Sequence, residues 1–309
     1  MNGEAEVMDH AIVRSRSRIL DYAELMKPEL TFLSVLSALC GFYLGSSGRF
    51  DLWLFVHTAV GTTLLGGGAG ALNQYIERGY DALMKRTERR PLPAGRVQPM
   101  EVFLFGTIIS IAGLVQLTVF TNPLTGFLGA ITFATYLFLY TPLKRMTTLS
   151  TIIGTIPGAL PPMMGWTAVR NELSPEAWAL FAILVCWQMP HFLSLAWLYR
   201  KDYARAGYKM LTVVDQEGTR TGWHIVTYSM LLIPVSVIPT VLGMAGLIYA
   251  CLAVCFGLAF LALGIQMLRT VGDNDPDRVT RVNFLARRVF FASLIYLPVL
   301  MLVMSLDKV

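Results

Sequence analysis

Three oxygen-bearing side chains, Asn73, Glu77 and Asp81, recur every fourth residue directly after a long apolar segment. On an α-helix this spacing places them along one narrow stripe. Amide and carboxylate oxygens on one face suit a hard cation such as Mg²⁺, and basic side chains beside them suit phosphate. We expect the helix to end at Pro91. The basic residues between the stripe and this proline are Lys85, Arg86, Arg89 and Arg90.

The same residues allow a plainer interpretation, in which an interfacial helix carries solvated charges that serve solubility. The spacing alone does not decide between this helix and a metal-diphosphate site at the mouth of a membrane helix. The decision needs a second group of residues that converges on the stripe.

A second charged loop offers such a group, because Arg200, Lys201 and Asp202 follow another apolar segment. If the two loops meet, Asp202 would face the stripe across a cavity and share the binding of a metal diphosphate. Asp202 could instead be the surface partner of Lys201 or Arg205, a pair that would contribute little to stability.

His191 lies inside an apolar segment, directly after Pro190. An ionisable residue within a membrane span points to function by default, so His191 is a candidate for ligating a metal or holding a substrate. The alternative is a neutral histidine bonded to a backbone carbonyl that Pro190 has freed.

The composition indicates which elements must position these residues. Hydrophobic residues make up 55% of the 309-residue chain and charged residues only 15%, whereas soluble proteins carry roughly 25% charged residues. Apolar runs long enough to cross a bilayer predict a polytopic all-α membrane protein. The nine expected spans cover 29–47, 53–73, 101–120, 124–141, 150–168, 176–197, 224–244, 246–267 and 284–305.

These spans divide the chain into a polar segment 1–28, a transmembrane domain 29–305 and a tail 306–309. We expect a helix over part of the first segment. The span at 150–168 contains Pro157, Pro161 and Pro162, and we expect these prolines to break it. Lys144 and Arg145 precede this span and form a third basic cluster.

The basic residues also predict the orientation. With nine spans, 22 of the 25 Lys and Arg residues fall on the side of the N-terminus, so the N-terminus and loops 74–100 and 198–223 are expected in the cytoplasm and the C-terminus in the periplasm. The early acidic residues do not fit a signal or transit peptide, which favours a bacterial cytoplasmic membrane. The net charge of +5 lies in short loops and does not indicate nucleic-acid binding.

Several longer motifs resemble one family. The run Asn73–Pro91 continues as Leu92–Arg96, and later motifs cover Tyr140–Arg145, Ile156–Trp166, Gln188–Phe192 and Asp202–Gly207. In order and content they are similar to the protoheme IX farnesyltransferases (haem O synthases), which belong to the UbiA superfamily of intramembrane prenyltransferases. The resemblance extends from about Asp21 to the last span.

The resemblance implies nine helices around a central cavity and transfer of the farnesyl group of farnesyl diphosphate to a vinyl group of haem B. It also implies Mg²⁺ bound by Asn73, Glu77, Asp81 and Asp202, with His191 orienting haem. The superfamily's second motif usually holds two acids and shows only Asp202 here, which leaves the number of ions open. The diphosphate-binding residues expected on this basis are Lys85, Arg86, Arg89, Arg90, Lys144, Arg145, Arg200 and Lys201.

Two alternatives stay open from the residues. One is a prenyltransferase of the same fold that acts on an aromatic acid or quinone precursor, and the other is a membrane transporter with broken helices. His191 within the membrane favours haem, and charges gathered at one end of the spans disfavour a transporter. Partners expected from the family are haem A synthase or terminal-oxidase assembly factors.

Overall fold

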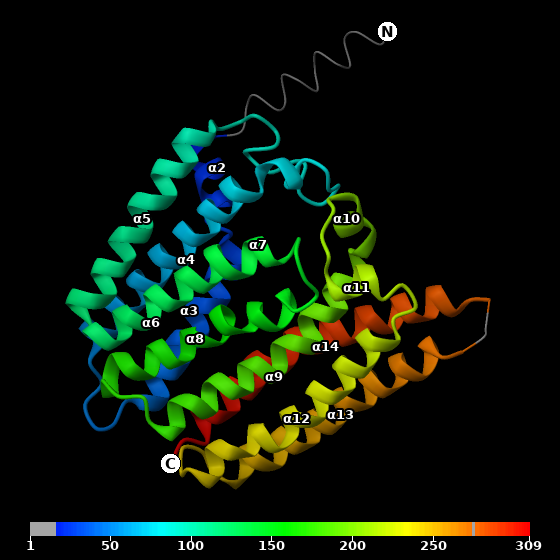
Figure 1. The fold of residues 1–309 in the computed structure, drawn as a ribbon. Helices are drawn as coiled ribbons and strands as arrows, with labels where there is room; N and C mark the ends of the chain where they lie inside the picture. Colours follow the sequence, from blue (N-terminus) through cyan, green and yellow to red (C-terminus); the bar gives the residue numbers. More distant parts are fainter. Residues whose placement is uncertain (1–16, 274–275) are drawn as a thin grey trace.

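In the computed structural model, which describes residues 17–273 and 276–309, the regular elements are all helices (Figure 1). A short α2 (Arg18–Leu25) supplies the helix expected before the first span; residues 1–16 of the predicted segment 1–28 lie outside the described residues. The long helices are α3 (Pro28–Gly45), α4 (Leu52–Asp81), α5 (Pro99–Phe120), α6 (Pro123–Ala134) with its continuations η1 (Thr135–Tyr140) and α7 (Thr141–Leu143), α8 (Ser150–Arg170), α9 (Pro175–Leu198), α12 (Thr219–Val241), α13 (Leu247–Val271) and α14 (Arg278–Leu306).

In the part of the chain that the structure describes, eight helices are long and apolar enough to cross a membrane. The ninth expected span is α8, a helix of 21 residues whose prolines, glycines and threonines make it less apolar than the others. The all-α membrane fold is therefore confirmed. Eight of the expected spans meet the length and hydropathy of membrane helices, and α8 packs between α3, α6 and α9.

The prediction that prolines break the fifth span is wrong, because α8 is one continuous helix with Pro157, Pro161 and Pro162 inside it. A proline keeps helical φ, but it lacks the N–H donor and its ring crowds the carbonyl of residue i−4; packed neighbours make these costs tolerable. Most of α8 is buried. Gln188 of α9 also donates to the backbone oxygen of Thr155 at 3.2 Å, which ties the two helices together.

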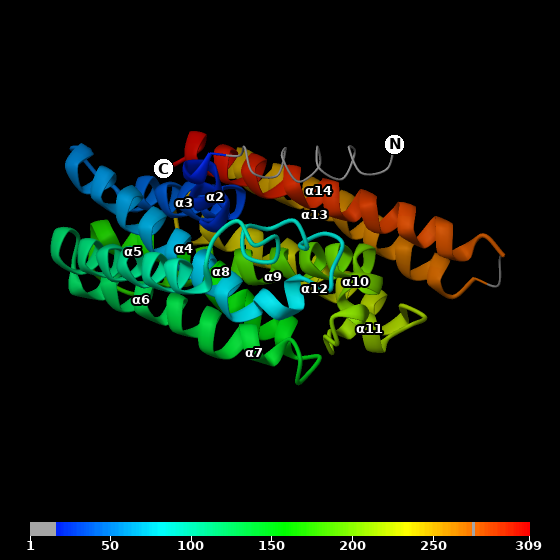
Figure 2. The same cartoon turned by 90° about the horizontal axis from the view of Figure 1, so that it is seen from above.

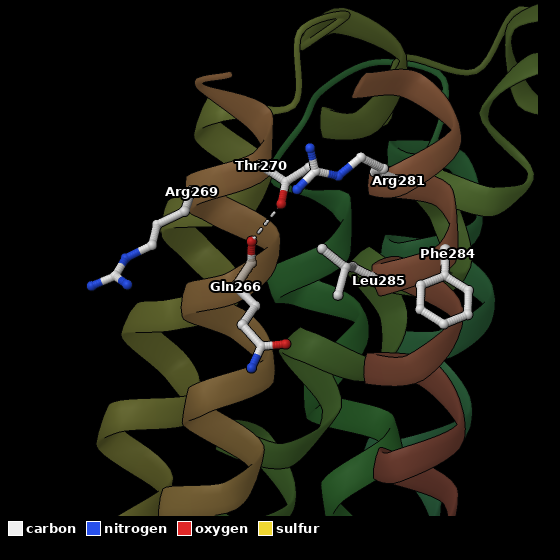
Figure 3. A pocket seen from close by; sticks show the side chains of 6 residues that line it. All are labelled: Gln266, Arg269, Thr270, Arg281, Phe284 and Leu285. Carbon is white, nitrogen blue, oxygen red and sulfur yellow. Dashed lines mark hydrogen bonds between the residues drawn. The ribbon is translucent and has the colours of Figure 1, made fainter. Parts of the chain in front are cut away.

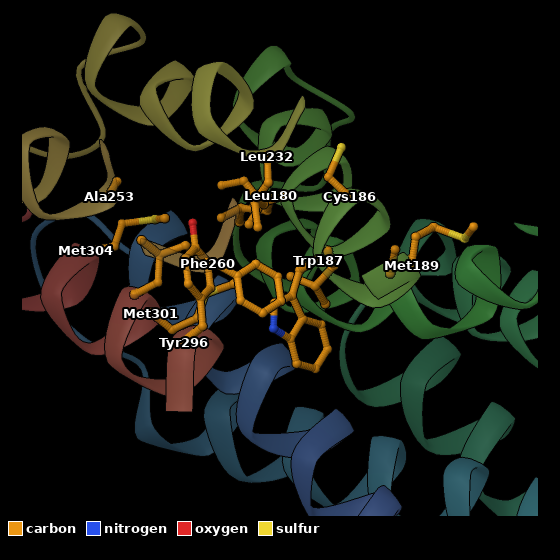
Figure 4. Packing of buried hydrophobic residues seen from close by; sticks show 14 of the residues in the cluster. Leu180, Cys186, Trp187, Met189, Leu232, Ala253, Phe260, Tyr296, Met301 and Met304 are labelled. Carbon is orange, nitrogen blue, oxygen red and sulfur yellow. The ribbon is translucent and has the colours of Figure 1, made fainter. Parts of the chain in front are cut away.

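Successive helices form a circuit in which α3, α4, α5, α6, α8, α9, α12, α13 and α14 each pack on the next, and α14 returns to α3 (Figure 2). The largest apolar core lies where α9, α12, α13 and α14 meet, around Trp187, Leu232, Phe260 and Tyr296 (Figure 4). Close backbone contacts join the other helices. A methyl group added at Gly68 of α4, for example, would overlap the Ser110 hydroxyl of α5.

The helix that carries the acidic stripe ends earlier than expected. α4 runs from Leu52 to Asp81, so the prediction that it continues to Pro91 is wrong. From Ala82 onward the chain forms turns instead. Thr87 supports the change of direction by donating its hydroxyl to the Asp81 backbone oxygen at 2.8 Å. Arg90 reaches back to the Asp81 carboxylate at the end of the helix.

The two charged loops meet. The loop after α4 and the segment after α9, which contains α10 (Arg200–Arg205) and α11 (Leu211–Val214), share a small core. Met84 and Tyr80 pack there against Tyr208 and Met210. This contact closes one end of the bundle and places the residues of both loops around the end of α4.

Candidate active site at the end of the fourth helix

Each member of the stripe on α4 is buried and lies against a cation. The Asn73 amide oxygen accepts from Lys27 Nζ at 2.5 Å, and Asp81 accepts from Arg90 at 2.8 Å. Glu77 accepts from Lys144 Nζ at 2.5 Å. Exposure of these three side chains is low, at 1% for Asn73, 6% for Glu77 and 1% for Asp81. The stripe is thus a buried cluster of alternating charge, and the interpretation as a solvated interfacial helix is wrong.

Residues from distant parts of the chain complete the contacts of Glu77. The Tyr208 hydroxyl donates to Glu77 at 3.1 Å. The backbone N–H of Lys209 donates to the Lys144 oxygen at 2.9 Å. The segment after α9 therefore fixes Lys144, and Lys144 in turn pairs with Glu77.

A π-helical turn positions the tyrosines of the site. In η1 the backbone is wound more widely than in an α-helix, a feature often found at functional sites. The Thr141 hydroxyl donates to the Tyr136 oxygen at 2.8 Å and accepts from the Asn73 amide at 2.9 Å. Lys27 Nζ donates to the Tyr136 hydroxyl at 3.2 Å, so η1 and the start of α3 are both joined to α4.

Lys27 is held in an unusual state. Its backbone is left-handed, with φ of 50° and ψ of 63°, which is uncommon for a residue other than glycine. Burial, together with Arg90, lowers the pKa of Lys27 to about 7, although Glu77 and Asp81 oppose the shift. The Lys27 ammonium group therefore interacts electrostatically with both the acidic and the basic side chains of the cluster.

The pKa of Lys144 shifts the other way. Burial alone would lower it, but the Glu77 carboxylate and the surrounding tyrosines outweigh burial and raise it. Burial and the same carboxylate raise the pKa of Tyr208. Lys144 therefore stays charged and Tyr208 stays protonated as a hydrogen-bond donor at neutral pH.

The other basic residues predicted in the first loop and before α8 lie outside the buried cluster, and we call them the rim residues. Arg86 is exposed and donates to the Tyr203 hydroxyl at 3.4 Å, with its guanidinium 5.2 Å from the Tyr199 ring centre. Arg145 donates to the Tyr80 hydroxyl. Lys85 and Arg89 are exposed, and no other described residue binds their charged groups.

The second loop contributes less directly to the cluster than predicted. Asp202 pairs with Arg205 at 3.3 Å, which was the alternative interpretation of its role. Arg200 donates to Asn283 at 3.0 Å and to the Trp197 oxygen at 2.8 Å. Lys201 is exposed. Among the described residues none of these side chains bonds to Asn73, Glu77 or Asp81, so their predicted roles at the metal and diphosphate stay predictions.

His191 lies between two rings at the contact of α9 and α14. Its ring stacks on Trp187, with centres 4.9 Å apart, and on Phe290, with centres 5.0 Å apart. Its Nδ1 lies 2.7 Å from the Ser293 hydroxyl. The expected alternative, a bond to a backbone carbonyl freed by Pro190, is therefore wrong, and no other described residue bonds to Nε2.

Two cavities lie at the ends of α9, α13 and α14. One, of about 390 Å³, lies between α13 and α14 and is lined by Arg269, Thr270 and Phe284 among others (Figure 3). The other, of about 490 Å³, lies between α9 and α14 and includes Arg200, Lys201 and Phe290 in its walls. Only the second is lined by residues predicted for the site.

The donor set fits a magnesium ion that is shared with a substrate. Mg²⁺ is commonly bound by one or two carboxylates together with substrate phosphates. Glu77 and Asp81 supply two carboxylates on one helix face, and Asn73 supplies an amide oxygen beside them. In the described part of the chain no three His, Cys, Asp or Glu residues are grouped to hold a metal alone. The chemistry thus agrees with a site that a diphosphate completes.

Comparison with known proteins identifies the family. The UbiA prenyltransferase family matches residues 34–295. The chain belongs to the UbiA prenyltransferase family. It is therefore an enzyme, and the transporter alternative is wrong. The matched residues include the acidic stripe, Lys144, His191 and Asp202.

Two relatives within this UbiA family are named protoheme IX farnesyltransferase. The one from Solibacter usitatus is 44% identical over 297 residues, covering 93% of this chain and 98% of its own. The one from Salinibacter ruber is 44% identical over 287 residues, with the same coverage of each chain. The family resemblance drawn from the motifs is confirmed.

Solved UbiA structures share the fold. A digeranylgeranylglyceryl phosphate synthase superposes with a TM-score of 0.76 at 16% identity and covers 94% of this chain and 98% of its own. A UbiA homologue from Archaeoglobus fulgidus bound to GPP and Mg²⁺ gives a TM-score of 0.69 at 15% identity, covering 90% of this chain and 99% of its own.

Four residues of the cluster were not predicted, namely Lys27, Tyr136, Thr141 and Tyr208. Thr141 lies within a motif that carried the resemblance, and Tyr208 follows directly after another. Lys27 precedes Pro28, and its left-handed backbone is not encoded by any local pattern. Lone basic and hydroxyl residues at span ends are common, so only the packing of α3, η1 and the second loop against α4 identifies them.

Proposed function

We propose that this UbiA enzyme transfers the farnesyl group of farnesyl diphosphate to a vinyl group of haem B, giving haem O and diphosphate. The name and the 44% identity of the relatives support this choice of substrates. The observation that carries it is the buried cluster at the end of α4, in which acids and cations alternate. A diphosphate bound together with Mg²⁺ suits such a cluster, because the acids can bind the metal ion and the basic side chains can bind the phosphate oxygens.

In this proposal Asn73, Glu77, Asp81 and Asp202 hold Mg²⁺. The ion, when bound, neutralises the diphosphate and makes it a better leaving group. Lys144 and Arg90 already lie against the acids and can interact with phosphate oxygens as the allylic C–O bond breaks. The remaining rim residues, Lys85, Arg86, Arg89 and Arg145, surround the same end of α4, and Arg200 and Lys201 belong to the second loop.

The acceptor chemistry requires a protected cation. Loss of diphosphate leaves an allylic farnesyl cation, and the terminal carbon of the haem vinyl group attacks its first carbon. Water then adds to the inner vinyl carbon and loses a proton, which gives the hydroxyethylfarnesyl group. In this proposal aromatic side chains such as the buried Trp187 and the half-buried Tyr136 would help to keep early water away.

His191 suits the acceptor rather than the diphosphate. Ser293 holds Nδ1, which leaves Nε2 as the nitrogen available to bind haem iron. Delivery of the product to haem A synthase or to a terminal-oxidase assembly factor stays a prediction from the family.

The test is a reconstituted reaction. Purified protein in lipid nanodiscs is incubated with haem B, farnesyl diphosphate and Mg²⁺. The pigments are then separated by chromatography and identified by mass spectrometry. We expect haem O and released diphosphate, with both lost when the ion is chelated. If haem B stayed unchanged with all components present, under conditions where the protein binds farnesyl diphosphate, the proposal would be contradicted.

A further inference from the structure

The cavity between α9 and α14 carries a charge that nothing in its walls balances. Three cations line it, Arg200 and Lys201 at the start of α10 and Arg287 on α14. No acidic residue of the described part of the chain lines it. Within the described residues none of the three forms an ion pair, whereas Lys144 and Arg90 in the cluster on α4 are both paired. Unpaired cations at one cavity point to an anionic ligand.

The neighbouring cavity provides a contrast. It also contains a basic residue of α14, Arg281, but this side chain lies 3.5 Å from Asp273. Figure 3 shows Arg281, Arg269 and Thr270 among the residues that line this cavity between α13 and α14. The α14 cation of the neighbouring cavity is therefore balanced by an acidic residue, whereas Arg287 of α14 in the cavity between α9 and α14 is not.

Part of the cavity wall is apolar. Phe290 and Phe291 of α14 line it together with Leu195 of α9. Phe290 stacks on His191 at a centre distance of 5.0 Å and an interplanar angle of 29°. Phe290 therefore lies between the cavity and the His191 imidazole, on which it stacks. A ligand that fits has an anionic end and a flat apolar body.

The cavity also adjoins the diphosphate side. Tyr199 lines it, and the Arg86 guanidinium lies 5.2 Å from the centre of the Tyr199 ring. One aromatic ring therefore separates the two groups of cations. A ligand in this cavity would lie beside a diphosphate held at the end of α4, as two substrates of one reaction require.

Arg200 is already oriented for a carboxylate. Its guanidinium stacks on Trp197 at 4.1 Å and donates to Asn283 at 3.0 Å. Trp197 donates to the same Asn283 oxygen at 3.1 Å. Because the planar guanidinium is fixed before a ligand arrives, less conformational freedom is lost on binding.

We propose that this cavity binds the two propionate carboxylates of haem through Arg200, Lys201 and Arg287, with the porphyrin directed toward Phe290 and His191. The inference rests on the proposed function and assigns Arg200 and Lys201 to the acceptor instead of the diphosphate. A volume of about 490 Å³ lies within the usual range for small-molecule sites. The two carboxylates would offset two of the three positive charges that line the cavity.

The test compares haem B with its dimethyl ester, which keeps the iron and porphyrin but lacks the two negative charges. Both are titrated by Soret absorbance into protein in nanodiscs of zwitterionic lipid. Charge-assisted hydrogen bonds predict that the wild type binds haem B at least about 10-fold more tightly than the ester. Arg287→Gln is the main variant because Arg200 also holds Trp197 and Asn283. It should bind haem B more weakly and reduce the preference, with the affinity for farnesyl diphosphate unchanged.

Arg288→Gln is the matched control, since Arg288 is the next residue on α14, is exposed and does not line the cavity. It should keep the wild-type preference. Equal affinity of the wild type for haem B and the ester would overturn the inference, as would an Arg287→Gln variant that loses farnesyl diphosphate affinity and keeps its preference for haem B. Failure to bind either porphyrin would instead refute the proposed function.

Discussion

At the scale of residues, Glu77 has two roles that can be separated. It pairs with Lys144 in a buried ion pair, with side-chain exposures of 8% and 10%, and it is a proposed ligand of the metal. Removing one partner of such a pair leaves an uncompensated buried charge, which costs about 3–5 kcal/mol. Glu77→Gln should therefore lower the melting temperature and also abolish turnover, by at least about 100-fold.

The double variant Glu77→Gln/Lys144→Met distinguishes these effects. With both charges gone, thermal melting in detergent should return most of the way to that of the wild type, while haem O formation stays absent. If the double variant regained activity along with stability, Glu77 would be a structural residue only.

Asp81→Asn is the corresponding test of the second carboxylate and should also remove turnover.

His191 provides the second prediction at this scale. His191→Ala should weaken haem binding and leave farnesyl diphosphate affinity nearly unchanged. Some loss of stability should accompany this, because the ring packs between Trp187 and Phe290, but Ser293 is not left unpaired since it also donates to the Phe290 oxygen at 2.5 Å. Soret titration and thermal melting measure the two effects. A variant that melts early but makes haem O at the normal rate while folded would remove His191 from the site.

At the scale of elements, small residues control how closely α3 and α8 approach. A methyl group at Gly165 would overlap the Ala38 backbone oxygen of α3. Gly165→Ala should therefore destabilise the protein by about 1–3 kcal/mol, the usual cost of overpacking. Gly79→Ala is the control, because a methyl group there meets nothing within 4 Å and alanine favours the helix by roughly 0.5–1 kcal/mol. Equal melting temperatures of the two variants would contradict this account of the packing.

The sequence predicted the elements better than their ends. Hydrophobic run length identified the spans, and the spacing of Asn73, Glu77 and Asp81 placed them on one helix face, because both depend on local periodicity. The continuity of α8 could not be read in this way, since it depends on neighbours such as Gln188 that tolerate its prolines. The end of α4 at Asp81 likewise depends on contacts of Thr87 and Arg90 that turn the chain back.

In the site, too, local motifs predicted some residues and long-range contacts determine the others. The acids and Lys144 were predicted from motifs, but Lys27, Tyr136 and Tyr208 join them through contacts between residues 46, 109 and 131 positions apart. No local pattern contains such pairings. Arg287 was not assigned to the site either, because its role depends on the cavity that α14 forms with α9.

At the scale of the whole molecule, the distribution of charge predicts the orientation. A reporter fused near Arg96 should be active in the cytoplasm, and one fused after Lys308 should be active on the opposite side of the membrane. Paired alkaline phosphatase and fluorescent-protein fusions measure this directly. A C-terminus on the cytoplasmic side would contradict the arrangement of nine spans, and with it the placement of the cluster on α4 toward the cytoplasm.

The central claim is that haem is the acceptor for the farnesyl group. The most direct measurement is a competition in which the reconstituted protein receives labelled farnesyl diphosphate, Mg²⁺ and equal amounts of haem B and a hydroxybenzoic acid. We expect the label to appear in a pigment whose mass equals that of haem B plus a farnesyl group and a hydroxyl group, and we expect Glu77→Gln/Lys144→Met not to form it. Label on the aromatic acid, with haem B unchanged, would contradict the claim and favour the quinone-precursor alternative.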